Sequence, residues 1–492
     1  MKTTSSVRFV SHLFVIAILL WTGPVFGLNQ FSRMGEIPIP DATLNTGGVG
    51  DMISGVDVDG DGLQEIYLVN DNSNDDPGQL VPKIYKMEYD GQDWAVVWQA
   101  VAPVVQQNTW PQLELADLDN DGKMELVWLI VNFLGPETNP NRVVVYEHAG
   151  GDDFGVPDGA GGFDPNSTWS YGSEYDGNDT RAISCEIADI DDDGVDEIIF
   201  ADRVVGDLDF GVMSVDDIPD DGDGTETWTM ELSSLDFGHV NWEKWDIAVI
   251  GNTFYAFNSV GISRITWNGS AYEYSELAAL PGGAPLDATK TVDLDGDGTL
   301  EMITGEYAWG DGTYHIWLLQ EDGSGDLIRT PLVNVGSQVR GGTFGDIDRD
   351  GYLDFIFGSR FGSPNAKIYR LAYRGGDITD SSNYDFTVID QEYHADGGIW
   401  ENVQLCNLDS DAHLEVLYAS SFFSTSTEAP IVVLDYQMPI YEGITRVVPS
   451  NGVAGTPVTV YGAGFGLSPS DMILRFGGME AAINAVEGGQ IL

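Results

Sequence analysis

The stretch Asp57-Val58-Asp59-Gly60-Asp61-Gly62-Leu63-Gln64-Glu65, followed by the apolar Ile66, decides the fold. Acidic residues stand at its first, third, fifth and ninth positions, and a glycine stands at the sixth. The same pattern begins again at Asp117, Asp189, Asp293 and Asp346. A weaker copy begins at Asn407, where an alanine replaces the glycine. Recurrence of one pattern along a chain indicates a repeat architecture.

The spacing of the copies gives the number of repeats. Consecutive copies start about 50 to 70 residues apart, except for a gap about twice as long between Asp189 and Asp293. Inside that gap, Trp245-Asp246-Ile247-Ala248-Val249 resembles the strand that follows each acidic loop. Aligning Asp246 with the ninth position puts Gly238, Val240 and Trp242 where the other acids belong, which predicts a repeat without a metal site. Seven repeats of this length predict an all-β, seven-bladed propeller.

The strands within one repeat support this prediction. In the first, apolar runs at 52–58 and 65–69 flank the acidic loop, and runs at 83–89 and 94–99 form a hairpin around Asp90-Gly91. The last repeat is one strand short after 430–436. The segment 31–39 has the pattern of an outer strand, so we expect it to complete that blade and close the ring.

The acidic loops have the chemistry of calcium sites. Calcium takes six to eight oxygen ligands, and a loop can supply carboxylates at positions one, three, five and nine and a carbonyl at position seven. Glycine at position six allows a sharp bend at positive φ. The predicted ligands are Asp57, Asp59, Asp61, Leu63 and Glu65; Asp117, Asp119, Asp121, Lys123 and Glu125; Asp189, Asp191, Asp193, Val195 and Glu197; Asp293, Asp295, Asp297, Thr299 and Glu301; Asp346, Asp348, Asp350, Tyr352 and Asp354; and Asn407, Asp409, Asp411, His413 and Glu415.

Two alternatives to calcium loops fit the repeated motif less well. A solvated acidic hairpin without metal accounts for one copy but not for five at blade spacing. An EF-hand needs a glutamate at position twelve, where this chain has strand residues: Leu68, Trp128, Phe200, Thr304, Phe357 and Tyr418. At the sixth copy, Asn407 and Ala412 predict weak or absent binding. The acidic segment 216–226 has the wrong spacing and is interpreted as a solvated hairpin tip.

Composition agrees with cation binding outside the cell. The net charge is -58, from 79 acidic and 21 basic residues, which disfavours nucleic acid and anionic membranes as partners. Hydrophobic residues make up 42%, too many for a disordered chain. Residues 1–27 have the pattern of a cleaved signal peptide, with an uncleaved anchor as the alternative. Cys185 and Cys406 lie in different repeats, which favours two buried free thiols over a disulfide.

The loops, with Gly345-Asp346 and Asp354-Phe355-Ile356-Phe357-Gly358, resemble the FG-GAP/VCBS repeats of integrin α-like propellers over 28–438. This resemblance implies calcium loops on one face. From Ile444 through Pro449-Ser450-Asn451-Gly452 to Gly464-Phe465-Gly466, the chain resembles an IPT/TIG immunoglobulin-like domain, here 443–492. We expect an incomplete β-sandwich there, because the domain needs more residues than remain before Leu492. Either its last strands are missing or, as we favour, the chain is a fragment of a longer surface protein.

The function predicted is a secreted or cell-surface, calcium-binding adhesion or recognition module for a protein or glycan. No catalytic residues are predicted, because nucleophile, zinc-protease and phosphate-loop motifs are missing from the sequence and its histidines are scattered. The alternatives are a calcium-dependent polysaccharide lyase or hydrolase on a propeller scaffold, and a structural spacer. The low Lys and Arg content argues against a lyase for acidic polysaccharides.

Overall fold

A computed structural model describes most of the chain between residues 30 and 491. The described ranges are 30–41, 47–71, 81–104, 111–130, 141–170, 182–203, 208–238, 244–258, 260–281, 286–307, 314–359, 366–392, 398–408, 413–421, 430–437, 443–448, 459–463, 474–476, 479–481, 486–487 and 490–491. The predicted signal peptide, residues 1–27, lies outside them.

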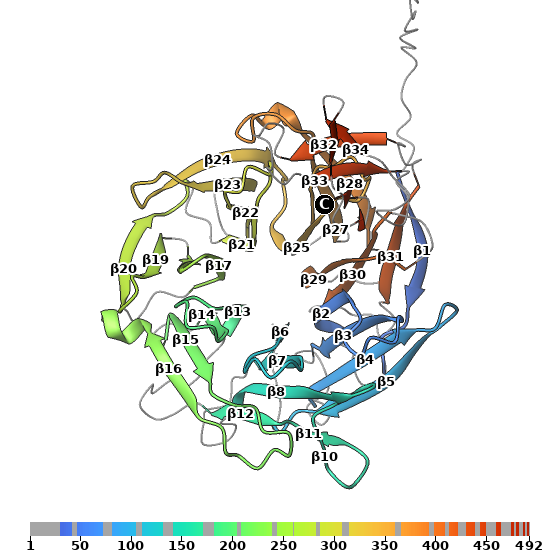
Figure 1. Cartoon of the computed structure of the whole chain (residues 1–492), viewed down its shortest axis with the longest axis vertical. Coiled ribbons are helices and arrows are strands. Elements are labelled where there is room, and N and C mark those ends of the chain that lie inside the picture. The colour runs from blue at the N-terminus through green and yellow to red at the C-terminus, as the bar shows by residue number, and fades with distance from the viewer. Residues whose placement is uncertain are drawn as a thin grey trace, which may run out of the picture.

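Strands form seven antiparallel blades around a central axis (Figure 1). Blade 1 contains β2 (Val49–Val56), β3 (Gln64–Asn70), β4 (Lys83–Tyr89) and β5 (Trp94–Val101). Blade 2 contains β6 (Gln112–Ala116), β7 (Glu125–Leu129), β8 (Asn141–Gly150) and β12 (Ser167–Ser170), with short strands β9 (Asp153–Phe154), β10 (Val156–Pro157) and β11 (Phe163–Asp164) between the last two. Blade 3 contains β13 (Ala182–Ala188), β14 (Glu197–Asp202), β15 (Phe210–Val215) and β16 (Trp228–Ser233), followed by the 3-10 helix η1 (Ser234–Phe237).

The remaining blades repeat the arrangement. Blade 4 contains β17 (Asp246–Ile250), β18 (Thr253–Phe257), β19 (Gly261–Trp267) and β20 (Tyr272–Ala278). Blade 5 contains β21 (Leu286–Val292), β22 (Glu301–Glu306), β23 (His315–Glu321) and β24 (Leu327–Asn334). Blade 6 contains β25 (Val339–Gly345), β26 (Asp354–Ser359), β27 (Lys367–Tyr373) and β28 (Tyr384–Gln391), with η2 (Ser381–Asn383) before β28. Blade 7 contains β29 (Gly398–Cys406), β30 (Glu415–Ser421), β31 (Ile431–Tyr436) and the N-terminal strand β1 (Phe31–Ile37).

Burial follows the position of a strand within its blade. The second strands β7 and β22 are buried along their whole length, as expected for strands covered on both faces. The outer strands β5 and β20 mix exposed and covered residues. Seven hydrophobic clusters result, each lying between two neighbouring blades. The core of this protein is therefore distributed around the ring.

The N-terminal strand closes the ring as predicted. β1 pairs antiparallel with β31, from Phe31 opposite Tyr436 to Ile37 opposite Ile431. Arg33 of β1 also forms a 3.0 Å ion pair with Asp390 of blade 6. The two ends of the propeller are thus joined in one blade, and the outer edge of β31 is covered.

The topology places the acidic loops on one face. Each loop joins the first and second strands of its blade, counted from the axis. Every blade has four main strands that alternate in direction, so the chain enters each inner strand from the same side. The parallel pairing of β2 with β29 shows this for one neighbouring pair. All first-to-second-strand connections consequently lie on the same face of the propeller.

Blade 4 corrects one alignment made from the sequence. The sequence pattern aligns Asp246 with the ninth acid, at the start of a second strand, but this residue begins the inner strand β17. The place of the acidic loop is taken by the turn Gly251-Asn252, since Ile250 pairs with Thr253. Blade 4 therefore exists and has a tight turn in place of an acidic loop. Gly238, which the sequence alignment placed in that connection, is not part of it. Val240 and Trp242 lie outside the described residues.

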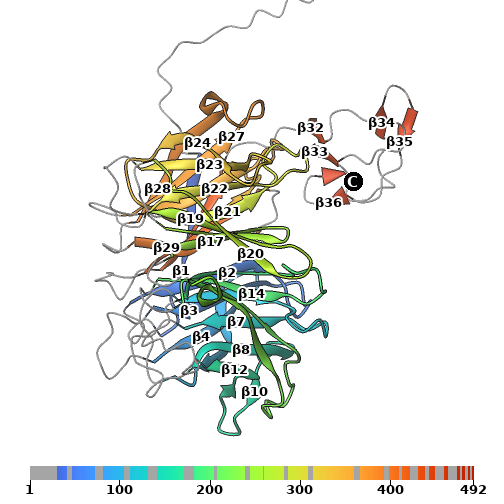
Figure 2. The same cartoon turned by 90° about the vertical axis from the view of Figure 1, so that its left-hand side faces the viewer.

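The C-terminal segment is also β-structure. β32 (Gly443–Val448), β33 (Thr459–Ala463), β37 (Gln490–Ile491) and β36 (Val486–Glu487) form one sheet, and β34 (Leu474–Phe476) pairs with β35 (Met479–Ala481). Figure 2 shows these strands outside the ring of blades. The all-β fold class and the seven-bladed propeller are confirmed. Cys185 and Cys406 are free and buried, as predicted.

Candidate metal centres

Five loops share one backbone geometry. In the loops of blades 1, 2, 3, 5 and 6, the N–H of the sixth-position glycine donates to the first aspartate, at 2.9 to 3.1 Å. These glycines have φ between 86° and 92°, which confirms the predicted bend. The N–H at position seven donates to the fifth-position aspartate, at 2.7 to 2.9 Å. Repetition of these bonds shows that the motif folds the same way in all five blades.

The ninth-position acid closes each loop. One of its carboxylate oxygens accepts the N–H of the second-position residue, as in Leu118 to Glu125 at 2.6 Å and Ile190 to Glu197 at 2.9 Å. The same bond occurs in blades 1, 5, 6 and 7. The second-position side chain is apolar in every copy and packs between blades; the six residues are Val58, Leu118, Ile190, Leu294, Ile347 and Leu408.

In blades 2 and 3 the other carboxylate oxygen of the ninth-position acid has no described hydrogen-bond partner. Glu125 and Glu197 are 0% exposed, and Oε1 of each has no hydrogen-bond partner among the described residues. Glu125 lies with Asp117 and Asp119 in a group whose ligand atoms are all within 4.8 Å of one another. Glu197 is grouped in the same way with Asp189 and Asp191. A buried, unsatisfied carboxylate oxygen facing other carboxylates fits a divalent cation.

Electrostatics support that fit. Burial, with smaller contributions from the charges of Asp119, Glu147 and Asp117, raises the pKa of Glu125 to about 9. Burial likewise raises the pKa of Glu197 to about 8 and that of Glu301 to about 7, again with aspartates of the same loop contributing. These carboxylates are costly to ionise by themselves, and a bound cation offsets that cost.

In two blades a buried basic side chain from the third strand contacts the acids of the loop. In blade 1, Nζ of Lys86 lies 2.9 Å from Asp59 Oδ2 and 2.8 Å from Glu65 Oε1. In blade 6, Nη2 of Arg370 lies 2.5 Å from Asp348 Oδ2 and 2.8 Å from Asp354 Oδ1. The third and ninth acids are therefore paired with a protein cation in both blades.

The loop of blade 7 is described only at its ends. Glu415 is buried and accepts the N–H of Leu408, as in the other blades. His413 is also buried and packs edge-on against Tyr436, with ring centroids 5.1 Å apart. Asp409 and Asp411 lie outside the described residues, so the ligand set that begins at Asn407 remains a prediction.

The acidic segment 216–226 is more than a solvated hairpin tip. Its aspartates are exposed, but Ile218 is buried among residues of blades 2 and 3. The N–H of Ile218 donates a 2.7 Å hydrogen bond to Asp119 of the neighbouring loop. Lys123 contacts Asp220 and Glu147, and lies 2.9 Å from Asp121. This hairpin therefore covers the loop of blade 2.

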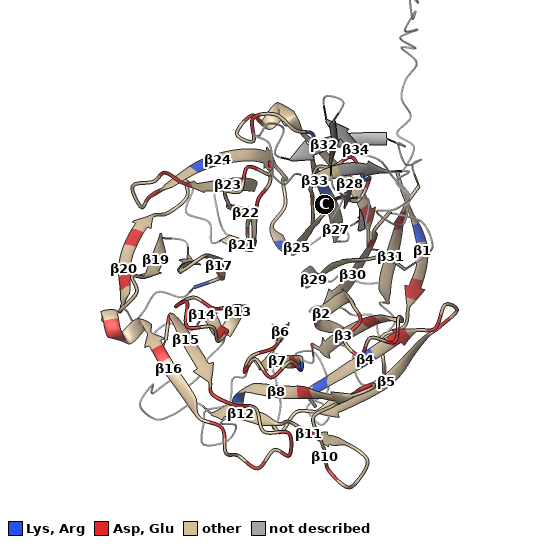
Figure 3. Ribbon diagram, viewed as in Figure 1, with Lys and Arg blue, Asp and Glu red and all other residues tan. Residues whose placement is uncertain are grey.

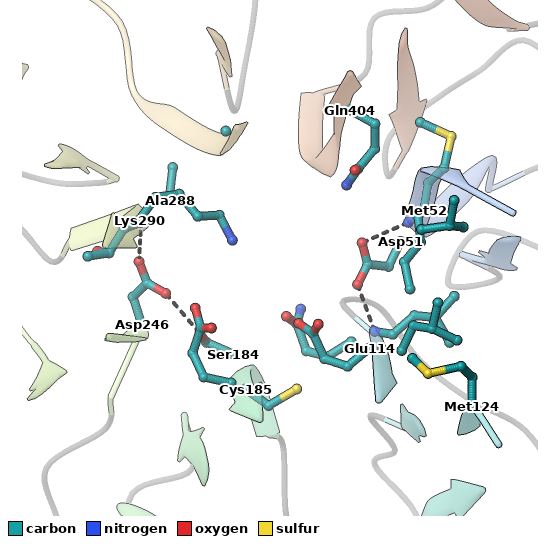
Figure 4. A pocket seen from close by; sticks show the side chains of 18 residues that line it. Asp51, Met52, Glu114, Met124, Ser184, Cys185, Asp246, Ala288, Lys290 and Gln404 are labelled. Carbon is teal, nitrogen blue, oxygen red and sulfur yellow. Dashed lines mark hydrogen bonds between the residues drawn. The ribbon is translucent and has the colours of Figure 1, made fainter. Parts of the chain in front are cut away.

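A pocket of about 400 Å³ opens at the centre of the ring (Figure 4). Asp51 accepts N–H groups from Met52 and from Leu113 of the next blade. Asp246 connects Ser184 with the N–H of Thr289, joining blades 3 and 5 to blade 4. These two acids hold neighbouring blades together. Glu114, Glu186 and Lys290 also line the pocket, so its charged lining is mainly acidic.

Comparison with known proteins agrees with the geometry. A family model described as an FG-GAP-like repeat matches residues 57–128 and 293–357, and an IPT/TIG domain model matches 443–492. The chain contains FG-GAP-like repeats and an IPT/TIG domain. Such domains are typical of extracellular proteins. No helix in the described part of the chain has the length and apolarity needed to span a membrane.

Curated proteins and solved structures add little to this assignment. No curated protein matches the chain. A crystal structure of a protein from Lactobacillus plantarum aligns with a TM-score of 0.44 and 13% identity, covering 71% of this chain and 86% of that one. A likeness at that level supports no statement about function.

Sequence reasoning on the FG-GAP-like repeats missed two features. The fourth loop position has positive φ in all five described loops, at Gly60, Asn120, Asp192, Gly296 and Arg349. A signal was present, since four of these residues are glycine, asparagine or aspartate, which tolerate that conformation. The basic partners Lys86 and Arg370 were also missed, because they lie on the third strand, outside the motif.

Proposed function

We propose that the chain is a secreted or cell-surface calcium-binding module that recognises a protein or glycan and performs no catalysis. The proposal that the loops bind calcium rests on one observation. Oε1 of Glu125 and Oε1 of Glu197 are buried without a hydrogen-bond partner among the residues that the structure describes, and each glutamate is grouped with two aspartates of its loop. The carbonyl at position seven is the further ligand we assign in each loop. Calcium is the cation whose preference for several oxygen ligands in a flexible loop suits this donor set.

The role proposed for calcium is structural. Each loop joins two strands of one blade, and its second residue packs into the cluster between that blade and the next. Ordering the loop around an ion therefore fixes both the hairpin and the packing between blades. This coupling of ion binding to loop order is expected wherever several carboxylates must converge.

A binding role is favoured because the pocket lining offers little for catalysis on acidic polymers. Asp51 and Asp246 are engaged in contacts between blades, and the pocket has one lysine, Lys290, among its acidic residues. A polyanionic chain such as a uronate polymer meets repulsion there. The lyase alternative thus has less support than binding of a neutral glycan or a protein.

Four measurements test this proposal. Metal analysis of the purified chain is expected to find calcium, and EGTA is expected to lower its melting temperature. Binding to glycan and protein arrays is expected to weaken when calcium is removed. Absence of calcium together with a melting temperature unchanged by EGTA contradicts the calcium role. Product formation from a uronate polymer contradicts the non-catalytic role.

A further inference from the structure

We propose that Lys86 and Arg370 are internal counter-cations, which take the place of calcium in the loops of blades 1 and 6 and confine tight calcium binding to blades 2, 3 and 5. The proposal rests on the calcium binding proposed above. It differs from the expectation that all five complete loops bind calcium. It also assigns a function to two buried basic side chains in a chain with only 21 Lys and Arg residues against 79 Asp and Glu. Acidic segments outnumber basic ones around the ring (Figure 3).

The two basic residues occupy equivalent positions. Lys86 on β4 pairs with Tyr67, and Arg370 on β27 pairs with Ile356. Tyr67 and Ile356 are each two residues beyond the ninth acid of their loop. The side chain at this position therefore points along the face of the blade toward that acid.

The same position is apolar in the three blades assigned to calcium. Val145 stands opposite Val127 in blade 2, Val212 opposite Ile199 in blade 3, and Leu318 opposite Ile303 in blade 5. An apolar side chain there leaves the ninth acid without a cation from its own blade. Among the described residues, no ion pair reaches Glu125, Glu197 or Glu301.

In blade 1 the lysine contacts the third and ninth acids of the loop, while Asp57, Asp59 and Asp61 still lie close together. Lys86 is 0% exposed, and its ammonium also contacts Glu88 at 2.7 Å and Asp152 at 3.0 Å. Oε2 of Glu65 accepts from the N–H of Val58 and from the hydroxyl of Tyr67, both at 2.8 Å. Oε1 of Glu65 has no hydrogen-bond partner among the described residues, and the contact that engages it is the 2.8 Å ion pair with Lys86. A calcium ion bound to Asp59 and Glu65 has to displace this ammonium or lie beside it.

In blade 6 two guanidinium groups share the loop. Besides the contacts of Arg370, Nη1 of Arg374 lies 3.0 Å from Asp348 Oδ2 and 2.7 Å from Asp350 Oδ2. The third, fifth and ninth acids therefore contact arginine. Only Arg370, 1% exposed, reaches the ninth acid, whereas Arg374 is 34% exposed and can move away as an ion binds. Oδ1 of Asp346 and Oδ1 of Asp348 have no hydrogen-bond partner in the described part of the chain, but two oxygens fall far short of the six to eight that calcium takes.

Blade 2 also has a lysine near its loop, Lys123, but its position differs from those of Lys86 and Arg370. Lys123 lies near Asp121, but its side chain is 32% exposed and it stands within the loop itself. It forms no ion pair with Asp117, Asp119 or Glu125 among the residues described. An exposed lysine can move away as an ion binds, whereas Lys86 and Arg370 are fixed in the interior.

Calcium stoichiometry tests the inference. Metal-free full-length chain is titrated with calcium in competition with a chromophoric chelator, and three tight sites are expected. Lys86→Met and Arg370→Met each remove a cation while keeping an apolar side chain of similar reach. Each is expected to raise the number of tight sites by one and to make the melting temperature more dependent on calcium than in the parent chain.

The converse substitution supplies the matched control. Val145→Lys places an ammonium at the equivalent position of blade 2 and is expected to remove one tight site, whereas Val145→Met is expected to retain all three. Five tight sites in the parent chain, or an unchanged count in both Lys86→Met and Arg370→Met, overturns the inference and leaves calcium binding intact. Failure of the parent chain to bind any calcium overturns the proposed function itself.

Discussion

The backbone N–H of Leu118 donates a 2.6 Å hydrogen bond to Oε2 of Glu125, and this bond folds the loop of blade 2 back on itself. The leucine side chain is buried between blades 2 and 3, while the glutamate presents its second oxygen to Asp117 and Asp119. One carboxylate thereby links packing between blades to the candidate ion site. Substitution can change the charge, the bend and the packing of such a loop separately.

Glu197→Gln in blade 3 separates charge from loop closure. The amide oxygen can still accept the N–H of Ile190, but the negative charge is lost. The variant is expected to bind one fewer calcium ion tightly, while its metal-free form melts no lower than the parent, because an amide is less costly to bury than a carboxylate. The count is measured by calcium titration. Asp93→Asn, at an exposed hairpin tip, is the control and is expected to retain every ion.

Metal-free stability is expected to fall as pH rises from about 5 to 9. Glu125 and Glu197 have native pKa values of about 9 and 8, against 4.5 for an ordinary glutamate. Between these limits the native state holds protons that the unfolded chain has released, so raising the pH favours unfolding. Below pH 4.5 both states are protonated and this dependence disappears.

Calcium is expected to remove much of this pH dependence, because the ion replaces the proton. Thermal melts of dialysed, metal-free protein across this range, repeated with added calcium, give the comparison. A metal-free melting temperature that rises between about pH 5 and 9 contradicts the burial of these acids.

Gly194→Ala tests the bend at the sixth loop position. Gly194 has φ of 91°, and an added Cβ meets nothing within 4 Å, so any cost comes from backbone conformation alone. The expected destabilisation is about 1–2 kcal/mol. Gly35→Ala is the matched control, because its Cβ also meets nothing within 4 Å and its φ is not positive. Denaturant unfolding of both variants gives the difference, and equal effects contradict the assignment.

Phe31→Ala tests closure of the ring by β1. Phe31 is buried between blades 6 and 7 and packs edge-on against Tyr436 at 5.2 Å. Its truncation is expected to cost about 3–5 kcal/mol in the free energy of unfolding. Met34→Ala, on the same strand but 44% exposed, is expected to have little effect. If the two variants unfold alike, β1 does not contribute to the ring as the structure places it.

Much of the fold was predictable because its signals are local. The acidic loop specifies a bend through Gly62 and its equivalents, and the apolar runs around it specify the hairpin. Closure by β1 was predictable because the last repeat lacked an outer strand and the N-terminal segment 31–39 had the pattern of one. Blade 4 was misaligned around Asp246, since the two-residue turn Gly251-Asn252 carries no comparable signal.

The sequence by itself determined the repeat, the bend and the acids that each loop can offer, because these depend on residues within nine positions of one another. The tertiary structure decided which loops already contain a cation. Lys86 lies 21 residues beyond Glu65, and only the register of β4 against β3 brings its ammonium to 2.8 Å from that carboxylate. The charge balance of a loop is therefore set by cross-strand pairing, which the loop sequence does not contain.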